Sequence, residues 1–235
     1  MKVAVLLPVY NGAPTLERAI KSLLEQTFVS WRLVLVDNNS TDNSVRIVQR
    51  LMMDADLEWT CLKCNQPGIV PTLNKGLFDI MSMNTDLIAR LDADDVWHPT
   101  KLAKQVSFLE KNQDINILGT QIMRVEGPDF KPCLQQMKYP TEDIDIKKML
   151  FSGNNAIAHP SVVFRKDIVL RTGGYDNTYP IAEDYHLWLK SAPWFKFANL
   201  EEVLTDYTVK HNSKYNPKCP QLCCISMKTA IENLL

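Results

Sequence analysis

The chain has 235 residues, 46% of them hydrophobic, and its 26 basic and 27 acidic side chains leave a formal net charge of −1. A chain of this size can bury a full core, and the interspersed charges give no reason to expect nucleic acid as a partner. Composition therefore indicates an ordinary soluble globular protein.

The N-terminal apolar run is too short for a secretory signal. Lys2 precedes apolar residues, but Pro8 and the Asn11-Gly12 turn then interrupt the run. No run elsewhere approaches the length of a membrane span. We expect a cytoplasmic protein, and peripheral association with the inner face of a membrane stays open.

The cysteines fall into groups that could in principle form a four-thiolate zinc site, Cys61 with Cys64 and Cys219 with Cys223 and Cys224. The first pair lies in a predicted strand, where residues three apart point to opposite faces, and neither group carries the Gly-rich turn usual in such sites. We therefore expect reduced thiols, in agreement with a cytoplasmic setting.

The first half of the chain alternates strands with helices. Apolar runs predict strands over residues 2–9, 31–37, 57–62 and 87–91, and apolar residues spaced three and four apart predict helices that include 16–24, 45–51, 73–81 and 102–109. This alternation predicts a parallel sheet covered by helices on both faces, with right-handed crossovers.

Three of these strands end in polar loops. Ligands bind beyond the carboxyl ends of the strands in such sheets, so the loops should meet along one edge and form a site. The candidate side chains lie in Tyr10-Asn11, Asp37-Asn38 and Asp92-Ala93-Asp94.

Asp92 and Asp94 end a short apolar strand, and their spacing puts both carboxylates on the same side of an extended chain. Hard cations such as Mg²⁺ and Mn²⁺ prefer oxygen ligands, and one or two protein carboxylates suffice when a substrate diphosphate completes the shell. The pattern therefore indicates a divalent-metal site. The alternative is a solvated acidic turn that caps the next helix.

The second half is less regular and predicts an α+β arrangement. Residues 115–125 favour a strand, residues 126–140 a loop without periodicity, and residues 203–210 another strand before a terminal helix. Glu183 and Asp184 open a predicted helix, and acidic residues in a first helical turn are favoured for dipole reasons alone.

Six short motifs follow one another along nearly the whole chain. They are Leu7-Pro8-Val9-Tyr10-Asn11, Val36-Asp37-Asn38-Asn39-Ser40-Thr41-Asp42, Ile88-Ala89-Arg90-Leu91-Asp92-Ala93-Asp94-Asp95, His159-Pro160-Ser161, Gly173-Gly174-Tyr175-Asp176 and Ala182-Glu183-Asp184-Tyr185-His186-Leu187-Trp188-Leu189. Each is short, but their order makes the match specific. The chain resembles the family 2 glycosyltransferases of the GT-A fold.

The resemblance implies a single GT-A domain over residues 1–235, a Rossmann-like α/β fold with a mixed, mainly parallel sheet flanked by helices. Residues 1–112 would bind the nucleotide-sugar, and residues 113–235 would form an α+β half that binds the acceptor. The implied activity is inverting transfer of a sugar from a nucleoside diphosphate, usually UDP, to a hydroxyl of a glycan, lipid-linked or other acceptor, in polysaccharide or glycoconjugate synthesis.

The acidic residues suit this chemistry. A Mn²⁺ or Mg²⁺ ion held by Asp94, with Asp92 against the ribose or in the metal shell, would neutralise the leaving diphosphate. Attack by the acceptor hydroxyl needs a base on the opposite face of the sugar. Asp184 matches the family's catalytic base, and Glu183 is the alternative, better suited to contacting a sugar.

The first two loops would bind the nucleotide. Pro8 and Tyr10, beside Asn11, match positions that pack on the base, although Tyr10 could instead be a core aromatic. Many relatives carry, at the position of Asn38, an acidic residue whose carboxylate accepts a hydrogen bond from the ring N–H of uracil. An Asn can also pair with that edge, so the base stays open, and Asp37 is a shared candidate.

Arg90, Ala93 and His211 complete the candidate set. Arg90 would approach the diphosphate or brace the acidic cluster, and Ala93 lies between the two acids. His211 resembles a late His that returns to the metal or diphosphate in some GT-A enzymes, and a neutral imidazole is an acceptable Mn²⁺ ligand. The alternative is a His exposed on a polar loop.

Two other functions stay open at this point. A nucleotidyltransferase or another Mg²⁺-dependent phosphoryl enzyme could also place carboxylates at strand ends, although the acceptor-side motifs favour glycosyl transfer. The second alternative is an inactive module that binds a sugar nucleotide, and the intact Asp92, Asp94 and Asp184 argue against it.

Overall fold

The computed structural model describes residues 1–55, 57–126 and 131–209. Its first half contains β1 (Val3–Val9), α1 (Ala13–Leu24), β2 (Trp31–Asp37), α2 (Ser44–Ala55), β3 (Trp59–Lys63), α3 (Ile69–Met81), β4 (Leu87–Arg90), β5 (Val96–Trp97) and α4 (Lys101–Lys111). Its second half contains β6 (Ile115–Glu126), β7 (Lys131–Met137), α5 (Asp143–Phe151), the 3₁₀ turn η1 (His159–Ser161), β8 (Val163–Arg165), α6 (Asp167–Thr172), α7 (Glu183–Ser191) and β9 (Lys196–Val209).

Within the described residues, nine strands form one sheet in the order β3-β2-β1-β4-β8-β6-β9-β5, and β7 pairs with β6. The first four strands of this order are parallel, as the alternation of strands and helices predicts. Beyond them β8 is antiparallel to both β4 and β6, and β6 runs parallel to β9. The expected mixed α/β fold is confirmed.

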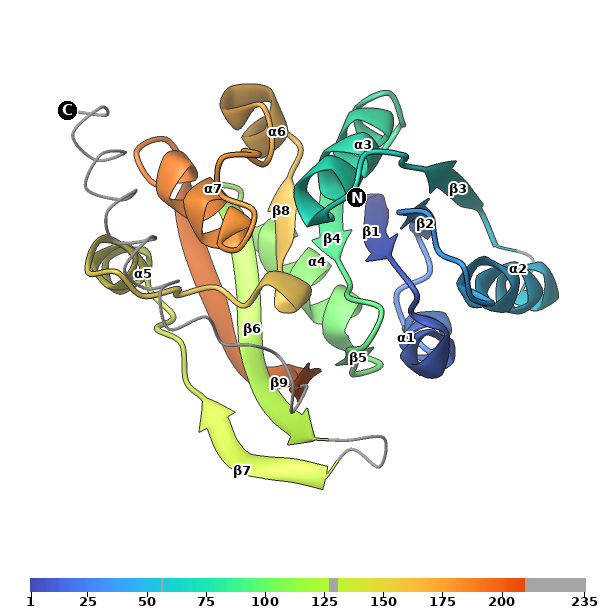
Figure 1. The fold of residues 1–235 in the computed structure, drawn as a ribbon. Helices are drawn as coiled ribbons and strands as arrows, with labels where there is room; N and C mark the ends of the chain where they lie inside the picture. Colours follow the sequence, from blue (N-terminus) through green and yellow to red (C-terminus); the bar gives the residue numbers. More distant parts are fainter. Residues whose placement is uncertain (56, 127–130, 210–235) are drawn as a thin grey trace.

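Helices cover both faces of this sheet (Figure 1). One core packs α1, α2 and α4 against the first face, and the other packs α3, α5, α6 and α7 against the second. In β1, Val3, Val5 and Leu7 belong to the first core, whereas Ala4 and Leu6 belong to the second. Burial on both faces explains why this strand is an unbroken apolar run in the sequence.

The segment 126–140, expected to be a loop, contains the strand β7. This strand is held by antiparallel pairing with β6, with a register shift between Met123 and Val125. The prediction was wrong because ladder hydrogen bonds to a distant strand stabilise a segment whose own pattern favours no regular structure. The third strand also lies two residues later at its start than the predicted 57–62.

The long strand β9 begins well before residue 203, where the sequence predicts it to start. The exposed Glu201 and Glu202 interrupt its apolar pattern. Thr120 of β6 pairs with Leu200 and the next residue pairs with Val203, so both glutamates fall within a register irregularity. A bulge of this kind hides the continuity of a strand from any period-two pattern.

The helices α5 and α6 have no counterpart among the predicted elements. Both are short, and α5 buries only Ile146 and Leu150, four residues apart. Cys61 and Cys64 are free thiols, as expected, whereas the second cysteine group and the predicted terminal helix lie outside the described residues. Among the helices that the structure describes, none has the length and apolar character needed to cross a bilayer.

The close packing of α3 on the sheet depends on Gly76. A Cβ at this position would lie 2.2 Å from Leu6 Cδ1 and 2.8 Å from Val36 Cγ2. Alanine gains up to about 1 kcal/mol in helix propensity over glycine, whereas overpacking of a core typically costs about 1–3 kcal/mol. Both neighbours are fully buried in the sheet, so we expect the overpacking cost to prevail.

We therefore predict that Gly76→Ala lowers the free energy of unfolding by about 1–2 kcal/mol, measured by urea denaturation. The adjacent Lys75→Ala is the matched control, because Lys75 is exposed on the same helix. It should change stability by less than about 0.5 kcal/mol. An unchanged unfolding midpoint for Gly76→Ala would contradict the close approach of helix and sheet.

Candidate active site

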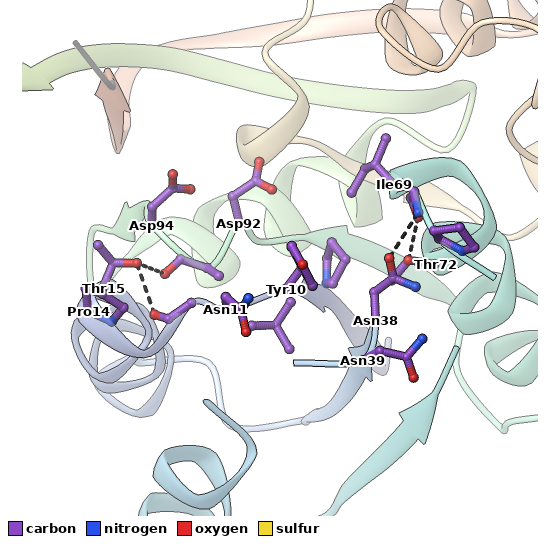
Figure 2. Close-up of a pocket in the computed structure, with 16 residues that line it drawn as sticks. Tyr10, Asn11, Pro14, Thr15, Asn38, Asn39, Ile69, Thr72, Asp92 and Asp94 are labelled. Atoms are coloured by element: carbon purple, nitrogen blue, oxygen red, sulfur yellow. Dashed lines mark hydrogen bonds between the residues drawn. The ribbon is translucent and has the colours of Figure 1, made fainter. Parts of the chain in front are cut away.

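A cavity of about 820 Å³ opens at the carboxyl ends of β1, β2 and β4 (Figure 2). The three polar loops that the sequence places along one edge do meet there. Seven of the predicted site residues line the cavity: Pro8, Tyr10, Asn11, Asn38, Asp92, Ala93 and Asp94. Two others, Asp37 and Arg90, lie behind the lining and support it.

The first two loops are tied to each other. Asn11 has a left-handed backbone with φ of 49°, which asparagine tolerates better than most residues. Its Oδ1 accepts the Thr41 N–H at 2.8 Å, and its own N–H donates to Ser40 Oγ at 3.0 Å. Tyr10 is 66% exposed at the cavity, so it is a surface aromatic and the core alternative is wrong.

Asp37 and Asn38 end β2 and stabilise neighbouring loops. The buried Asp37 carboxylate accepts the Ser40 N–H at 3.1 Å, which shapes the turn after β2. Asn38 lines the cavity, but its carboxamide is hydrogen-bonded to the segment between β3 and α3. These local roles are invisible in the sequence, because the partners of Asn38 lie 26 to 30 residues away.

Arg90 supports the acidic loop from within the protein. It is 1% exposed, and its Nη2 donates to Asp92 Oδ1 at 2.6 Å. Burial alone would lower the pKa of the guanidinium, but the charges of Asp92 and Glu183 and the Tyr175 phenol outweigh it and raise that pKa. Arg90 therefore stays charged and braces the acidic cluster, one of the two roles expected from the sequence.

Two residues of α1 that the sequence analysis missed hold the backbone of the acidic loop. Thr15 Oγ1 donates to the Ala93 carbonyl at 2.8 Å, and Arg18 Nη2 donates to the Asp94 carbonyl at 3.0 Å. Residues three apart share one face of a helix. A Thr and an Arg three residues apart, in the first turns of a helix that follows a strand end, are the sequence signal that could have predicted this contact.

The third carboxylate of the acidic loop has a different place. Asp95 is fully buried and accepts the Thr208 N–H at 2.8 Å, which ties the loop to β9. Burial, and then the charges of Asp92 and Asp94, raise the pKa of Asp95. Asp95 therefore anchors the loop, and of its three acidic residues only Asp92 and Asp94 line the cavity.

The donor set at the cavity consists of the Asp92 and Asp94 carboxylates. In the described part of the chain, no group of three His, Cys, Asp or Glu residues could hold a metal ion. Two carboxylates fit a hard divalent cation when a diphosphate supplies further oxygen ligands. His211, the third expected ligand, lies outside the described residues.

A second pair of carboxylates begins α7. Asp184 Oδ2 accepts from Asn155 Nδ2 at 2.7 Å, and Asn155 is another residue that the sequence analysis missed. Glu183 Oε1 lies 4.0 Å from Nδ1 of His159, whose Nε2 lies 2.8 Å from the Tyr175 hydroxyl. Burial, and then Arg90, lower the pKa of His159, so its imidazole is neutral.

The surroundings raise the pKa of both carboxyl groups. Burial, followed by the charge of Asp184, raises the pKa of Glu183 to about 8. Burial also raises the pKa of Asp184, but the Tyr185 N–H and the Asn155 amide oppose this rise. The charge of Asp92, which follows β4, raises both pKa values further.

Comparison with known proteins identifies relatives of this chain. The family model described as Glycosyl transferase family 2 matches residues 4–173. The bifunctional glycosyltransferase pgtA of Dictyostelium discoideum is 30% identical over 89% of this chain, which spans 31% of that protein. The O-antigen biosynthesis glycosyltransferase WbnJ of Escherichia coli is 28% identical over 90% of this chain and 81% of its own length.

A third relative is the UDP-Gal:alpha-D-GlcNAc-diphosphoundecaprenol beta-1,3-galactosyltransferase of Escherichia coli. It is 30% identical over 87% of this chain and 73% of its own length.

Two solved structures show the same fold. Staphylococcus aureus TarS in complex with UDP-GlcNAc superposes with a TM-score of 0.79 at 17% identity, over 99% of this chain and 67% of that one. The mannosyltransferase PcManGT from Pyrobaculum calidifontis, in complex with GDP-Man and Mn²⁺, gives 0.72 at 18% identity over 98% and 64%. With the family match over residues 4–173, the chain belongs to glycosyltransferase family 2 and has the GT-A fold.

Proposed function

We propose that this glycosyltransferase moves a sugar, with inversion and with a divalent metal, from a nucleoside-diphosphate sugar to an acceptor hydroxyl. The observation that carries the proposal is the cavity at the carboxyl ends of β1, β2 and β4, where the exposed Tyr10 ring and the Asp92 and Asp94 side chains line one space. A sugar whose diphosphate binds Asp92 and Asp94, with Asp184 on its opposite face, would have its leaving group on one side and a base on the other, which inversion requires.

On the donor side, Tyr10 offers an exposed ring for the nucleobase, and Pro8 lines the same cavity. Asp92 and Asp94 would hold Mn²⁺ or Mg²⁺, whose charge would stabilise the departing diphosphate. Arg90 positions Asp92 through the 2.6 Å hydrogen bond, and Arg18 and Thr15 hold the loop that carries the two acids. A UDP-sugar is the favoured donor, and uracil therefore the favoured base, because the TarS and Escherichia coli proteins are described with UDP-sugars.

On the acceptor side, Asp184 is the proposed base. Its pKa is raised toward the range useful for proton transfer, yet the Asn155 amide and the Tyr185 N–H favour its charged form. Glu183 lacks the hydrogen bond from the Asn155 amide, and it retains its proton to a pH of about 8. The unequal environments support Asp184 as the base and Glu183 as a contact to a sugar hydroxyl.

We further propose that residues 1–112 bind the donor and residues 113–235 the acceptor, within a single domain. The Escherichia coli relative is described as acting on a diphosphoundecaprenol-linked acceptor. By analogy, a glycan or lipid-linked hydroxyl is the favoured acceptor class here, with the protein peripheral to the cytoplasmic face of a membrane. The named glycosyltransferase relatives disfavour a nucleotidyltransferase or another phosphoryl enzyme.

The metal role gives the next prediction. Asp94→Asn keeps the side-chain volume but removes a charge, so Mn²⁺-dependent UDP affinity should fall by about tenfold to a hundredfold. Isothermal titration with UDP, with and without Mn²⁺, measures this. Asp54→Asn, an exposed carboxylate on α2, is the matched control and should leave the affinity unchanged. If the unmutated protein binds UDP equally with and without Mn²⁺, the metal role is refuted.

The catalytic pair is separated by two isosteric substitutions. Asp184→Asn cannot accept the hydroxyl proton, so turnover should fall by roughly 10²–10⁴-fold while UDP–Mn²⁺ affinity stays the same. The assay follows nucleotide release in a screen of UDP-, GDP- and dTDP-sugars with Mn²⁺. Glu183→Gln should reduce turnover much less. If only Glu183→Gln abolishes release, the two assignments are reversed.

The raised pKa of Glu183 also predicts a pH-dependent stability. Between its ordinary pKa of 4.5 and about 8, the folded protein holds a proton that the unfolded chain releases. The free energy of unfolding should therefore decrease as pH rises through this window, by up to about 3 kcal/mol between pH 5.5 and 8.

Glu183→Gln should abolish that part of the pH dependence, measured by urea denaturation at several pH values. Glu25→Gln, an exposed glutamate at the end of α1, should retain the dependence of the unmutated protein. Identical slopes for Glu183→Gln and the unmutated protein would show that Glu183 titrates near its ordinary pKa.

A further inference from the structure

Asn38 sits at the end of the cavity away from Asp94, together with Ile69 and Thr72 (Figure 2). It is 9% exposed, and its carboxamide already makes three hydrogen bonds. Nδ2 donates to the Cys64 carbonyl at 2.9 Å and to the Gln66 carbonyl at 2.7 Å. Oδ1 accepts the Gly68 N–H at 3.0 Å.

These bonds use both N–H donors of the carboxamide and one of its two acceptor positions. A side chain that reads a nucleobase edge needs a free donor or acceptor aimed at the ligand, and here both donors are committed to protein carbonyls. The acceptor oxygen is likewise held by a backbone N–H. Donation from Asn38 to a base would therefore require breaking contacts that the protein already has, and only the second acceptor position of Oδ1 stays open.

The segment that Asn38 holds is one wall of the cavity. Pro67, Gly68 and Ile69 belong to the lining, directly where α3 begins. Gly68 has φ of 112° and ψ of 160°, a conformation essentially restricted to glycine. The Thr72 hydroxyl donates to the Gly68 carbonyl at 2.7 Å, so both backbone polar groups of Gly68 are hydrogen-bonded to side chains.

We propose that Asn38 is a positioning residue that fixes the Pro67–Ile69 wall of the nucleobase end and does not donate a hydrogen bond to the base. The inference rests on the proposed function, since it assigns this end of the cavity to the nucleobase and the acidic end to the diphosphate. The base is then contacted by Tyr10 and by the wall that Asn38 holds.

Asn38→Asp separates the two roles. An aspartate that reads the base would accept from the ring N–H of uracil and would keep or raise UDP affinity. An aspartate in the positioning role puts one carboxylate oxygen against both the Cys64 and the Gln66 carbonyl, in place of the two N–H donors of Nδ2. It should release the wall and lower UDP affinity by about tenfold or more, measured by isothermal titration with Mn²⁺.

Pyrophosphate with Mn²⁺ is the second probe, because it occupies only the acidic end, and its affinity should not change in Asn38→Asp. Asn84→Asp is the matched control, since Asn84 is an exposed residue before β4 with the same change in charge. It should keep UDP affinity within about twofold. Retained or raised UDP affinity in Asn38→Asp would overturn the proposal.

Hydrogen exchange in the nucleotide-free protein tests the wall directly. Asn38→Ala removes the acceptor of the Gly68 N–H, so that amide should exchange faster while the amides of β1 keep their protection. Unchanged exchange at Gly68 would also overturn the proposal. If the unmutated protein binds neither UDP nor pyrophosphate, the proposed function fails, and the exchange result still decides whether Asn38 holds the wall.

Discussion

A buried guanidinium supports the acidic loop that follows β4. Arg90 is inaccessible to solvent, and a charge in such a place is tolerated only when it is paired and hydrogen-bonded. Its hydrogen-bond partners are the Asp92 carboxylate at 2.6 Å and the Leu91 carbonyl. Replacing such a residue would leave the Asp92 carboxylate without compensation, a change that costs far more than the pair itself contributes. The placement of the Asp92 carboxylate therefore depends on this side chain.

The same constraint explains the proton balance at the start of α7. Arg90 favours the charged form of Glu183, but burial and the charge of Asp184 oppose it more strongly. Asp184 receives an amide hydrogen bond from Asn155 that Glu183 lacks. Two adjacent carboxylates thus have different hydrogen-bond surroundings, although burial raises the pKa of both.

The end of the cavity near Tyr10 and Asn38 is organised by hydrogen bonds between its loops. Its loops are held by side chains that cross between them, such as Asn11 on Thr41 and Asn38 on Gln66. Loops supported in this way present a defined surface to a ligand, which reduces the ordering that binding would otherwise require. The acidic end is held by α1 through Thr15 and Arg18, so each end of the cavity has its own support.

The parallel first half of the sheet and the meeting of three loops at one edge were predictable from the amino-acid pattern, because apolar runs that end in polar loops follow directly from burial. The order of the motifs likewise predicted the family. The supporting roles of Asp37, Arg90 and Asp95 behind the cavity, and the strand at residues 131–137, became visible only in the folded chain. Those outcomes depend on partners distant in the chain, and a local pattern records a side chain's chemistry but not the atom it will contact.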